Sequence, residues 1–133
     1  MKFPYRKYDV FYKPVLPVIF KVEEASIQYP ALIDTGSDIS IIHAEIAESL
    51  GLRLNNGQKY FFGGIGGRGE GFIHHVDMVI SGITFLNTPV VFTDDIVLFG
   101  FGILGHEGLF DRMKLVFEFH KKELELIPKN YKK

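Results

Sequence analysis

Short runs of β-type residues, each ended by glycine or another turn residue, are the feature that most limits how this chain can fold. Apolar and polar residues alternate at 76–80, 115–119 and 123–126, the pattern of strands with one buried face. The chain holds 14 glycines and 13 phenylalanines, and aromatic or β-branched runs bounded by glycine are typical of strands joined by tight turns. We therefore predict an all-β domain.

The expected elements follow from these patterns. Strands are predicted at residues 15–22, 26–33, 39–42, 59–62, 76–80, 84–92, 96–99, 115–119 and 123–126. Ala44, Ala47 and Leu50 have helical spacing ahead of Gly51, and residues 105–114 have the pattern of a second short helix, so one or two short helices are expected. Six glycines between residues 63 and 71 indicate a hairpin with a flexible tip, and the last two strands should form another hairpin.

Composition and charge exclude several classes of function. A chain of 133 residues is expected to form a single domain, with a core of about 15–127 between basic terminal segments. The absence of cysteine excludes disulfides, thiolate nucleophiles and iron–sulfur clusters. The net charge of −1 argues against nucleic acid as a partner. We see no apolar run of membrane length and no signal peptide, so no membrane partner and a cytoplasmic protein are expected.

Charge is distributed unevenly along the chain. Residues 1–13 and the end of the chain, from Pro128 onward, each carry +3, which leaves −7 for the residues between them. Two interpretations remain open. The basic ends are either solubilising tails or segments that meet an acidic body across a subunit interface.

The segment ALIDTGSDISII, residues 31–42, is the first candidate site. Asp34 follows three apolar residues, so it should emerge from the end of a buried strand into a turn that Gly36 permits. Backbone N–H groups and the hydroxyls of Thr35 and Ser37 would surround the carboxylate and stabilise its ionised form. The alternative is an Asx-turn between two strands, with no chemical role.

The segment FGFGILGHEG, residues 99–108, is the second candidate. Gly100, Gly102 and Gly105 fit the G-x-G-x-x-G pattern of a dinucleotide site. Only 28 residues follow Gly105, too few for the remaining parallel strands of such a sheet, and their pattern is antiparallel. The same pattern at 64–69 precedes a strand instead of a helix. Nucleotide binding is therefore kept only as a weaker alternative.

Together these segments resemble the retropepsin-like aspartic proteases, the single-domain relatives of pepsin that include the retroviral enzymes. ALIDTGSDISII is similar to their active-site segment, FFGGIGG to their glycine-rich flap, and GILG followed by HEGLFDRMKLVFEF to their second signature. The three motifs occur in the family's order and the likeness covers residues from about 15 to 127. The resemblance implies a single-domain closed β-barrel that is active as a homodimer.

The resemblance also implies a role for each matching residue. Asp34 would be the catalytic carboxylate, Thr35 would support it through the facing subunit, and Gly36 would make the turn and a substrate contact. Ser37 would hydrogen-bond the carboxylate, and Asp38 would bind the substrate backbone. The residues that would cover the bound peptide are Gly63, Gly64, Ile65, Gly66 and Gly67. The residues that would pack beneath the loop are Ile103, Leu104 and Gly105.

His106 departs from the family pattern, because retroviral enzymes usually carry an arginine after this glycine. The ion pair of that arginine is therefore either missing here or dependent on pH.

One carboxylate cannot serve as both base and acid in amide hydrolysis. The chain has no second D-T-G or D-S-G, so a two-fold homodimer would supply the second carboxylate as the symmetry mate of Asp34. The expected substrate is a peptide or protein, with no cofactor and no metal. His74 and His75 would point to opposite faces of a strand, which disfavours a shared ligand role. An inactive peptide-binding or dimerisation module on the same fold is the alternative.

Overall fold

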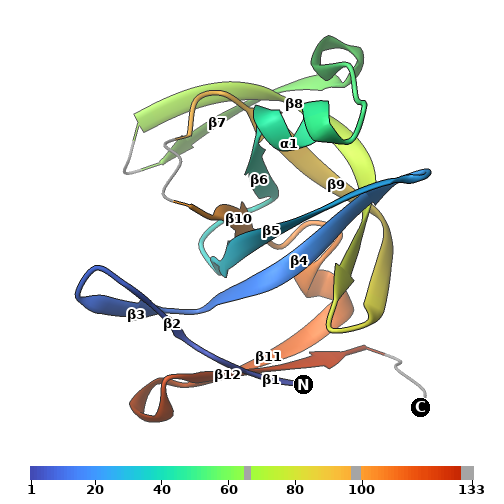
Figure 1. The fold of residues 1–133 in the computed structure, drawn as a ribbon. Helices are drawn as coiled ribbons and strands as arrows, with labels where there is room; N and C mark the ends of the chain where they lie inside the picture. Colours follow the sequence, from blue (N-terminus) through green and yellow to red (C-terminus); the bar gives the residue numbers. More distant parts are fainter. Residues whose placement is uncertain (65–66, 97–99, 130–133) are drawn as a thin grey trace.

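The computed structural model describes residues 1–64, 67–96 and 100–129, and its largest sheet forms a barrel. Seven strands follow the order β4-β5-β10-β6-β9-β8-β7, with a further pairing between β4 and β8. Their bounds are Val15–Val22 (β4), Ala25–Ile33 (β5), Ser40–His43 (β6), Gln58–Gly64 (β7), Gly67–Ile80 (β8), Ile83–Thr93 (β9) and Gly102–Leu104 (β10). All of these except β7 therefore close into a ring (Figure 1), and the predicted all-β barrel is confirmed.

The length of β8 explains how the ring closes. This strand has 14 residues, so its first part pairs with β7 while its last part reaches β4, where Phe20 lies opposite Met78. The ladder between β8 and β9 shifts register between Val76 and Met78. Such an irregularity bends a strand and increases its twist, which suits the turn that β8 makes around the barrel.

The barrel interior is filled by the apolar faces that alternation predicted. Val76, Met78 and Ile80 of β8 are buried, as are Phe20 of β4 and Phe92 of β9. These side chains belong to one large cluster that also includes residues of β5, β10 and the helix. The strands predicted at 76–80 and 84–92 are therefore confirmed as parts of β8 and β9.

Helix α1 (Ala44–Ser49) confirms the first helical prediction. Ala44, Ile46 and Ala47 are buried against the barrel, and the Nδ1 of His43 accepts a hydrogen bond from the backbone N–H of Glu45 at the N-terminus of the helix. The chain reverses after the helix at Gly51, whose φ of 75° suits a residue without a side chain.

The second predicted helix, at 105–114, is wrong. Only a single 3-10 turn, η2 (Phe110–Arg112), forms in that segment. Gly108 has a φ of 70° and Leu109 has a φ of −129°, and neither value continues an α-helix. Two other 3-10 turns, η1 (Leu54–Asn56) and η3 (Phe119–Lys121), complete the helical segments of the described chain.

The two ends of the chain meet in a separate three-stranded sheet below the barrel (Figure 1). Strands β11 (Met113–Glu118) and β12 (Glu123–Pro128) form the predicted hairpin, and β1 (Lys2–Pro4) pairs with β12 on its other side. The segment between β1 and the barrel folds into a hairpin of β2 (Arg6–Tyr8) and β3 (Phe11–Lys13). None of these three N-terminal strands was predicted. For β1 the reason is that its partner, β12, lies more than a hundred residues away in the sequence.

Two other expectations can be compared with the described residues only. The short strand expected at 96–99 lies mostly outside the described residues, and Ile96 itself is in a bend. Among the helices that the structure describes, none has the length and apolar character needed to cross a membrane.

Candidate active site

Asp34 stands directly after β5, at the start of a loop that joins β5 to β6. Strand β5 runs parallel to β10, with Ile33 opposite Leu104. The backbone N–H of Asp34 continues this ladder by donating to the carbonyl of Leu104 (3.1 Å), and the N–H of Ile33 donates to Pro14 (2.9 Å). The main chain on which the carboxylate is mounted is therefore fixed on both sides by the barrel.

The turn after Asp34 is closed by hydrogen bonds within residues 34–37. The N–H of Gly36 donates to Oδ1 of Asp34 (2.9 Å), and the N–H of Ser37 donates to the carbonyl of Asp34 (3.1 Å). Thr35 and Gly36 are exposed, and Asp34 is half-buried. This geometry includes the Asx-turn that the sequence offered as an alternative, but it also leaves Oδ2 of Asp34 without a hydrogen-bond partner in the described chain.

The Ser37 hydroxyl acts differently from the expectation. It donates its one proton to the carbonyl of Ile39 (2.7 Å), so in this single chain it does not donate to the Asp34 carboxylate. The hydroxyl instead stabilises the turn that leads into β6. In the described chain, the Ser37 hydroxyl therefore does not stabilise the ionised form of Asp34 through a hydrogen bond.

The segment 103–105 packs beneath this loop, as the resemblance implied. Ile103 lies opposite Ile41 of β6, and the N–H of Gly105 donates to the buried hydroxyl of Ser40 (3.1 Å). A methyl group at position 105 would lie 2.6 Å from the carbonyl of Ile39 and 2.7 Å from that of Ser37. Only glycine permits this close approach.

His106 binds the loop from below through its side chain and its backbone. Its Nε2 lies 2.6 Å from the carbonyl oxygen of Thr35, and its N–H donates to the carbonyl of Ser37 (3.0 Å). Because a carbonyl oxygen only accepts, Nε2 must carry a hydrogen. The ring packs edge-on against Phe110, with 5.5 Å between the ring centres. The ion pair of the family's arginine is therefore replaced here by a hydrogen bond to the main chain.

The β7–β8 hairpin extends over the barrel, with its free end on the same side as the loop at 34–39 (Figure 1). Gly64 and Gly67 are opposite each other at that end, whereas Ile65 and Gly66 lie outside the described residues. The middle of the hairpin is held at Glu70, which lies opposite Phe61. Its N–H donates to Oδ2 of Asp95 (2.9 Å), and its carbonyl accepts from the buried hydroxyl of Thr93 (2.6 Å).

These contacts at Glu70 were missed by the sequence analysis. Residues 93–95 have the composition of a simple turn, and nothing in their spacing indicates that they bind a strand more than twenty residues earlier. The same is true of Ser40, whose hydroxyl is the partner of Gly105. Thr93, Asp95 and Ser40 have short side chains, so they reach these partners only because the fold brings the segments together.

The other candidate sites gain no support from the structure. Gly105 is followed by a turn and the three-residue η2, so the helix that a dinucleotide site needs after its glycines is missing from the described chain. His74 binds the carbonyl of Leu54 through Nε2 (2.9 Å), while His75 is exposed. The described residues hold no group of three or more metal-binding side chains.

Comparison with protein families identifies the family of this chain. The model of a family described as gag-polyprotein putative aspartyl protease matches residues 21–109, a range that includes the loop at 34–38, the β7–β8 hairpin and Gly105. The chain belongs to the retropepsin-like aspartic proteases. Among solved structures, EIAV protease complexed with the inhibitor HBY-793 is similar, with 27% identity and a TM-score of 0.54 over 75% of this chain and 88% of that chain. No curated protein sequence matches.

The family model matches part of this retropepsin-like chain. The matched range begins near the end of β4, contains the other strands of the barrel and the β7–β8 hairpin, and ends at residue 109, before β11 and β12. The N-terminal strands β1, β2 and β3 also lie outside it. The similarity to EIAV protease covers 75% of this chain, so the likeness of this retropepsin-like chain to that structure extends beyond the range that the family model matches.

Proposed function

We propose that this chain is an aspartic endopeptidase that acts as a homodimer, with Asp34 of each copy as the catalytic carboxylate. The observation that supports the proposal is how Asp34 is mounted. Its main chain is bonded to β10, Gly36 binds one of its carboxylate oxygens, and it forms no ion pair among the described residues. Because the barrel holds the main chain of Asp34 at its rim, its carboxylate suits a site that the Asp34 carboxylate of a second copy completes.

Two copies are needed because the reaction uses two carboxyl groups in opposite protonation states. Carboxylates about 3 Å apart do not both ionise, so the pair shares one proton and titrates as a unit. The ionised member accepts a proton from a water molecule held between them, and the water oxygen forms a bond to the carbonyl carbon of the peptide. The protonated member donates its proton to the carbonyl oxygen at the same time.

Collapse of the tetrahedral intermediate completes the reaction. The C–N bond breaks as the carboxyl group that gained a proton passes it to the leaving nitrogen, and the second carboxylate recovers its proton from the intermediate's hydroxyl. The products are a carboxylic acid and an amine, and the pair returns to its starting state. Every bond made or broken in this scheme involves water, the peptide or the two Asp34 side chains.

The geometry also supports an extended peptide as the substrate. The β7–β8 hairpin ends on the side of the Asp34 loop, and its main chain would pair there with an extended segment. Gly36 is exposed beside Asp34, which allows a peptide backbone to come close. Gly63, Gly64 and Gly67 would cover the peptide, and Asp38, which is exposed, would bind its backbone.

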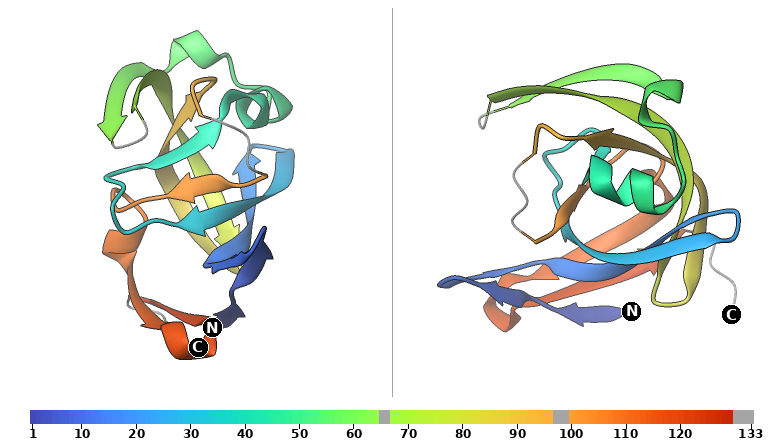
Figure 2. Two further views of the ribbon diagram at one scale, coloured as in Figure 1. Left: turned by 90° about the vertical axis from the view of Figure 1, so that its left-hand side faces the viewer. Right: turned by 45° about the horizontal axis from the view of Figure 1, so that its top comes forward.

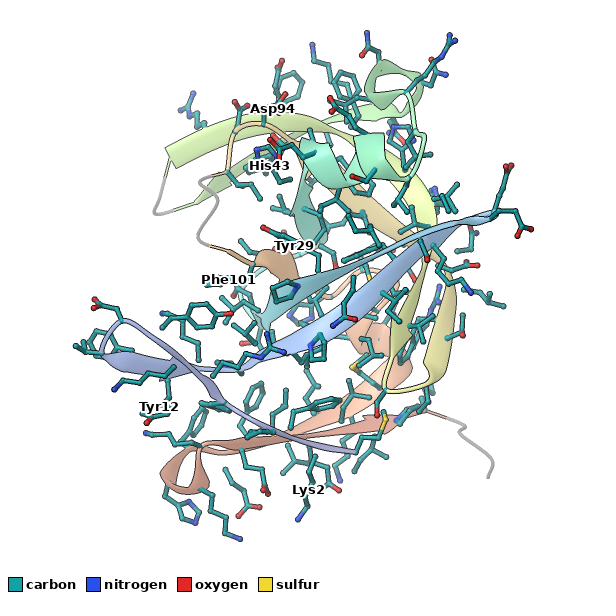
Figure 3. The ribbon with its side chains drawn as sticks, in the orientation of Figure 1. Lys2, Tyr12, Tyr29, His43, Asp94 and Phe101 are labelled. Carbon is teal, nitrogen blue, oxygen red and sulfur yellow. The ribbon has the colours of Figure 1, made fainter. Side chains whose placement is uncertain are left out.

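The test is the substitution Asp34→Asn, with Asp94→Asn as the matched control. Asp94 is an exposed aspartate in the bend that follows β9 (Figure 3). We expect the Asp34 variant to lose cleavage of a peptide library while it still sediments as a dimer. We expect the control to cleave like the wild type. Cleavage that survives Asp34→Asn would contradict the proposal, and a wild-type protein that binds peptides but never cleaves them would indicate an inactive binding module.

A further inference from the structure

The outer part of the β7–β8 hairpin has little support from the barrel sheet. The ladder between β8 and β9 ends at the pair of Phe72 and Phe92. From this pair toward the free end of the hairpin, β8 forms a ladder with β7 alone in the described chain. A two-stranded hairpin without further support is at best marginally stable in water. The contacts that hold this part of the hairpin must therefore come from outside the sheet.

Glu70 provides such a contact through its main chain. Alternate residues of a strand direct their N–H and C=O groups to opposite neighbours, and both groups of Glu70 face the segment that follows β9. The N–H donates to Oδ2 of Asp95 (2.9 Å), and the C=O accepts from the hydroxyl of Thr93 (2.6 Å). The same hydroxyl accepts from the N–H of Asp95 (2.9 Å), which closes the turn that carries both side chains. Residues 93–95 thus bind β8 where β9 no longer does, and Figure 1 and Figure 2 (right) show this segment beneath the hairpin.

The approach of Asp95 to β8 depends on a missing side chain. A methyl group at position 69 would lie 3.0 Å from Cβ of Asp95 and 2.4 Å from Cζ of Phe62. Only glycine leaves room for both neighbours. The ring of Phe62 therefore lies across Gly69, on the same part of the hairpin that Asp95 holds.

Phe62 connects this part of the hairpin to the candidate active site. Its half-buried ring packs against an apolar cluster that includes Ile39 and Ile103. Ile39 directly follows the loop at 34–38, and Ile103 belongs to the segment beneath that loop. The position of the hairpin above the loop is therefore fixed from two sides, by the packing of Phe62 and by the hydrogen bond to Asp95.

We propose that Asp95 is a positioning residue for peptide binding. By holding the main chain of Glu70, it keeps Phe62 and the neighbouring Gly63 at the distance from the Asp34 loop at which a peptide fits between them. The inference rests on the proposed function, because that function places the peptide between the hairpin and the loop. It adds a residue that contacts neither Asp34 nor the peptide and that nevertheless controls affinity for the peptide.

The test compares Asp95→Ala with Asp94→Ala. Asp94 is the matched control because it is a neighbouring exposed aspartate that does not bind Glu70. Both changes are made in the Asp34→Asn variant, so that the peptide is not cleaved. The probe is the library peptide that this variant binds most tightly, labelled with fluorescein, and its Kd is measured by fluorescence anisotropy. We expect Asp95→Ala to raise Kd about threefold to tenfold, as loss of one hydrogen bond to a charged group does, and Asp94→Ala to leave it unchanged.

Asp95→Asn is the conservative variant that should restore binding. The amide oxygen of asparagine can still accept from the N–H of Glu70, although without the charge, so Kd should return to within about twofold of the value with Asp95. Hydrogen exchange of the Glu70 amide, followed by NMR without peptide, should be faster in Asp95→Ala and close to the wild-type rate in Asp95→Asn. With Asp34 intact, Asp95→Ala should raise KM and change kcat less than about twofold.

The outcomes separate this inference from the proposed function. If the wild type cleaves peptides and Asp95→Ala binds them equally well, Asp95 does not position the hairpin, although the protease assignment stands. Alanine and asparagine variants that bind equally weakly would show that the hydrogen bond is not the cause, which also overturns the inference. If the wild type binds peptides without cleaving them, weaker binding by Asp95→Ala alone would support the inference while the protease assignment fails. A wild type that binds no peptide would overturn both.

Discussion

Removing the His106 side chain should impair the proposed reaction more than it impairs the fold. Four hydrogen bonds join the loop at 34–38 to the segment 104–107, and three of them connect main-chain atoms only. The fourth, from Nε2 of His106 to the carbonyl of Thr35, is the shortest at 2.6 Å and is the one bond of the four that a substitution can delete. It acts on the residue next to Asp34, so its loss should loosen the position of the carboxylate.

The size of the effect follows from what the ring contacts. One hydrogen bond contributes about 0.5–1.5 kcal/mol net, and an aromatic edge-to-face contact such as that with Phe110 contributes about 0.5–1.5 kcal/mol. His106 is exposed, so water replaces part of the lost bond and the lower half of each range applies. We therefore expect His106→Ala to reduce the free energy of unfolding by about 1–2 kcal/mol.

Catalysis should respond through kcat. Small displacements of a catalytic group are costly, and a tenfold rate loss corresponds to about 1.4 kcal/mol of transition-state stabilisation. For His106→Ala we expect kcat to fall about tenfold with KM changed less than about twofold, because the contact positions Asp34 and does not touch the peptide. The control is His106→Gln, whose side-chain N–H₂ offers the same donor to Thr35 and should restore most of kcat.

The assay is steady-state peptide cleavage at a protein concentration that keeps both variants dimeric, combined with urea unfolding. A His106→Ala enzyme that is less stable but retains the wild-type kcat would refute the positioning role. A glutamine variant as slow as the alanine variant would show that the hydrogen-bond donor is not what matters.

Three further predictions concern other parts of the chain. Burial raises the pKa of the Tyr5 hydroxyl, which has no hydrogen-bond partner among the described residues. Wild-type stability should therefore fall as the pH rises above about 10, because the unfolded chain loses this proton there and the folded chain keeps it. Urea unfolding at about pH 8 and about pH 11 should show a smaller fall for Tyr5→Phe. At the lower pH this variant should be more stable than the wild type by about 1 kcal/mol, because it removes a buried hydroxyl without a partner. Gly105→Ala should lower the free energy of unfolding by about 3 kcal/mol or more, because the added methyl overlaps the Ile39 carbonyl; a fully stable variant would contradict this. Thr93→Val should cost about 1–3 kcal/mol by leaving the Glu70 carbonyl unpaired, and hydrogen exchange across 58–80 should become faster.

The sequence predicted the elements whose causes are local. Strand β4 was predicted with its observed bounds, and α1 follows from three small or apolar residues at helical spacing with Gly51 at the end. The loop after Asp34 was placed correctly as well, since an apolar strand followed by a glycine turn is a pattern of neighbouring residues.

Only the tertiary structure decided which groups meet across long stretches of chain. The parallel pairing of β5 with β10 sets Leu104 beside Asp34, and the pairing of β1 with β12 turns an apparent tail into a strand. The Ser37 hydroxyl donates to the carbonyl of Ile39 and not to the Asp34 carboxylate, which residue type alone does not settle. Local structure depends on adjacent residues, which the sequence shows directly. The long-range partners depend on how the barrel closes and on which polar groups then lie within hydrogen-bonding distance.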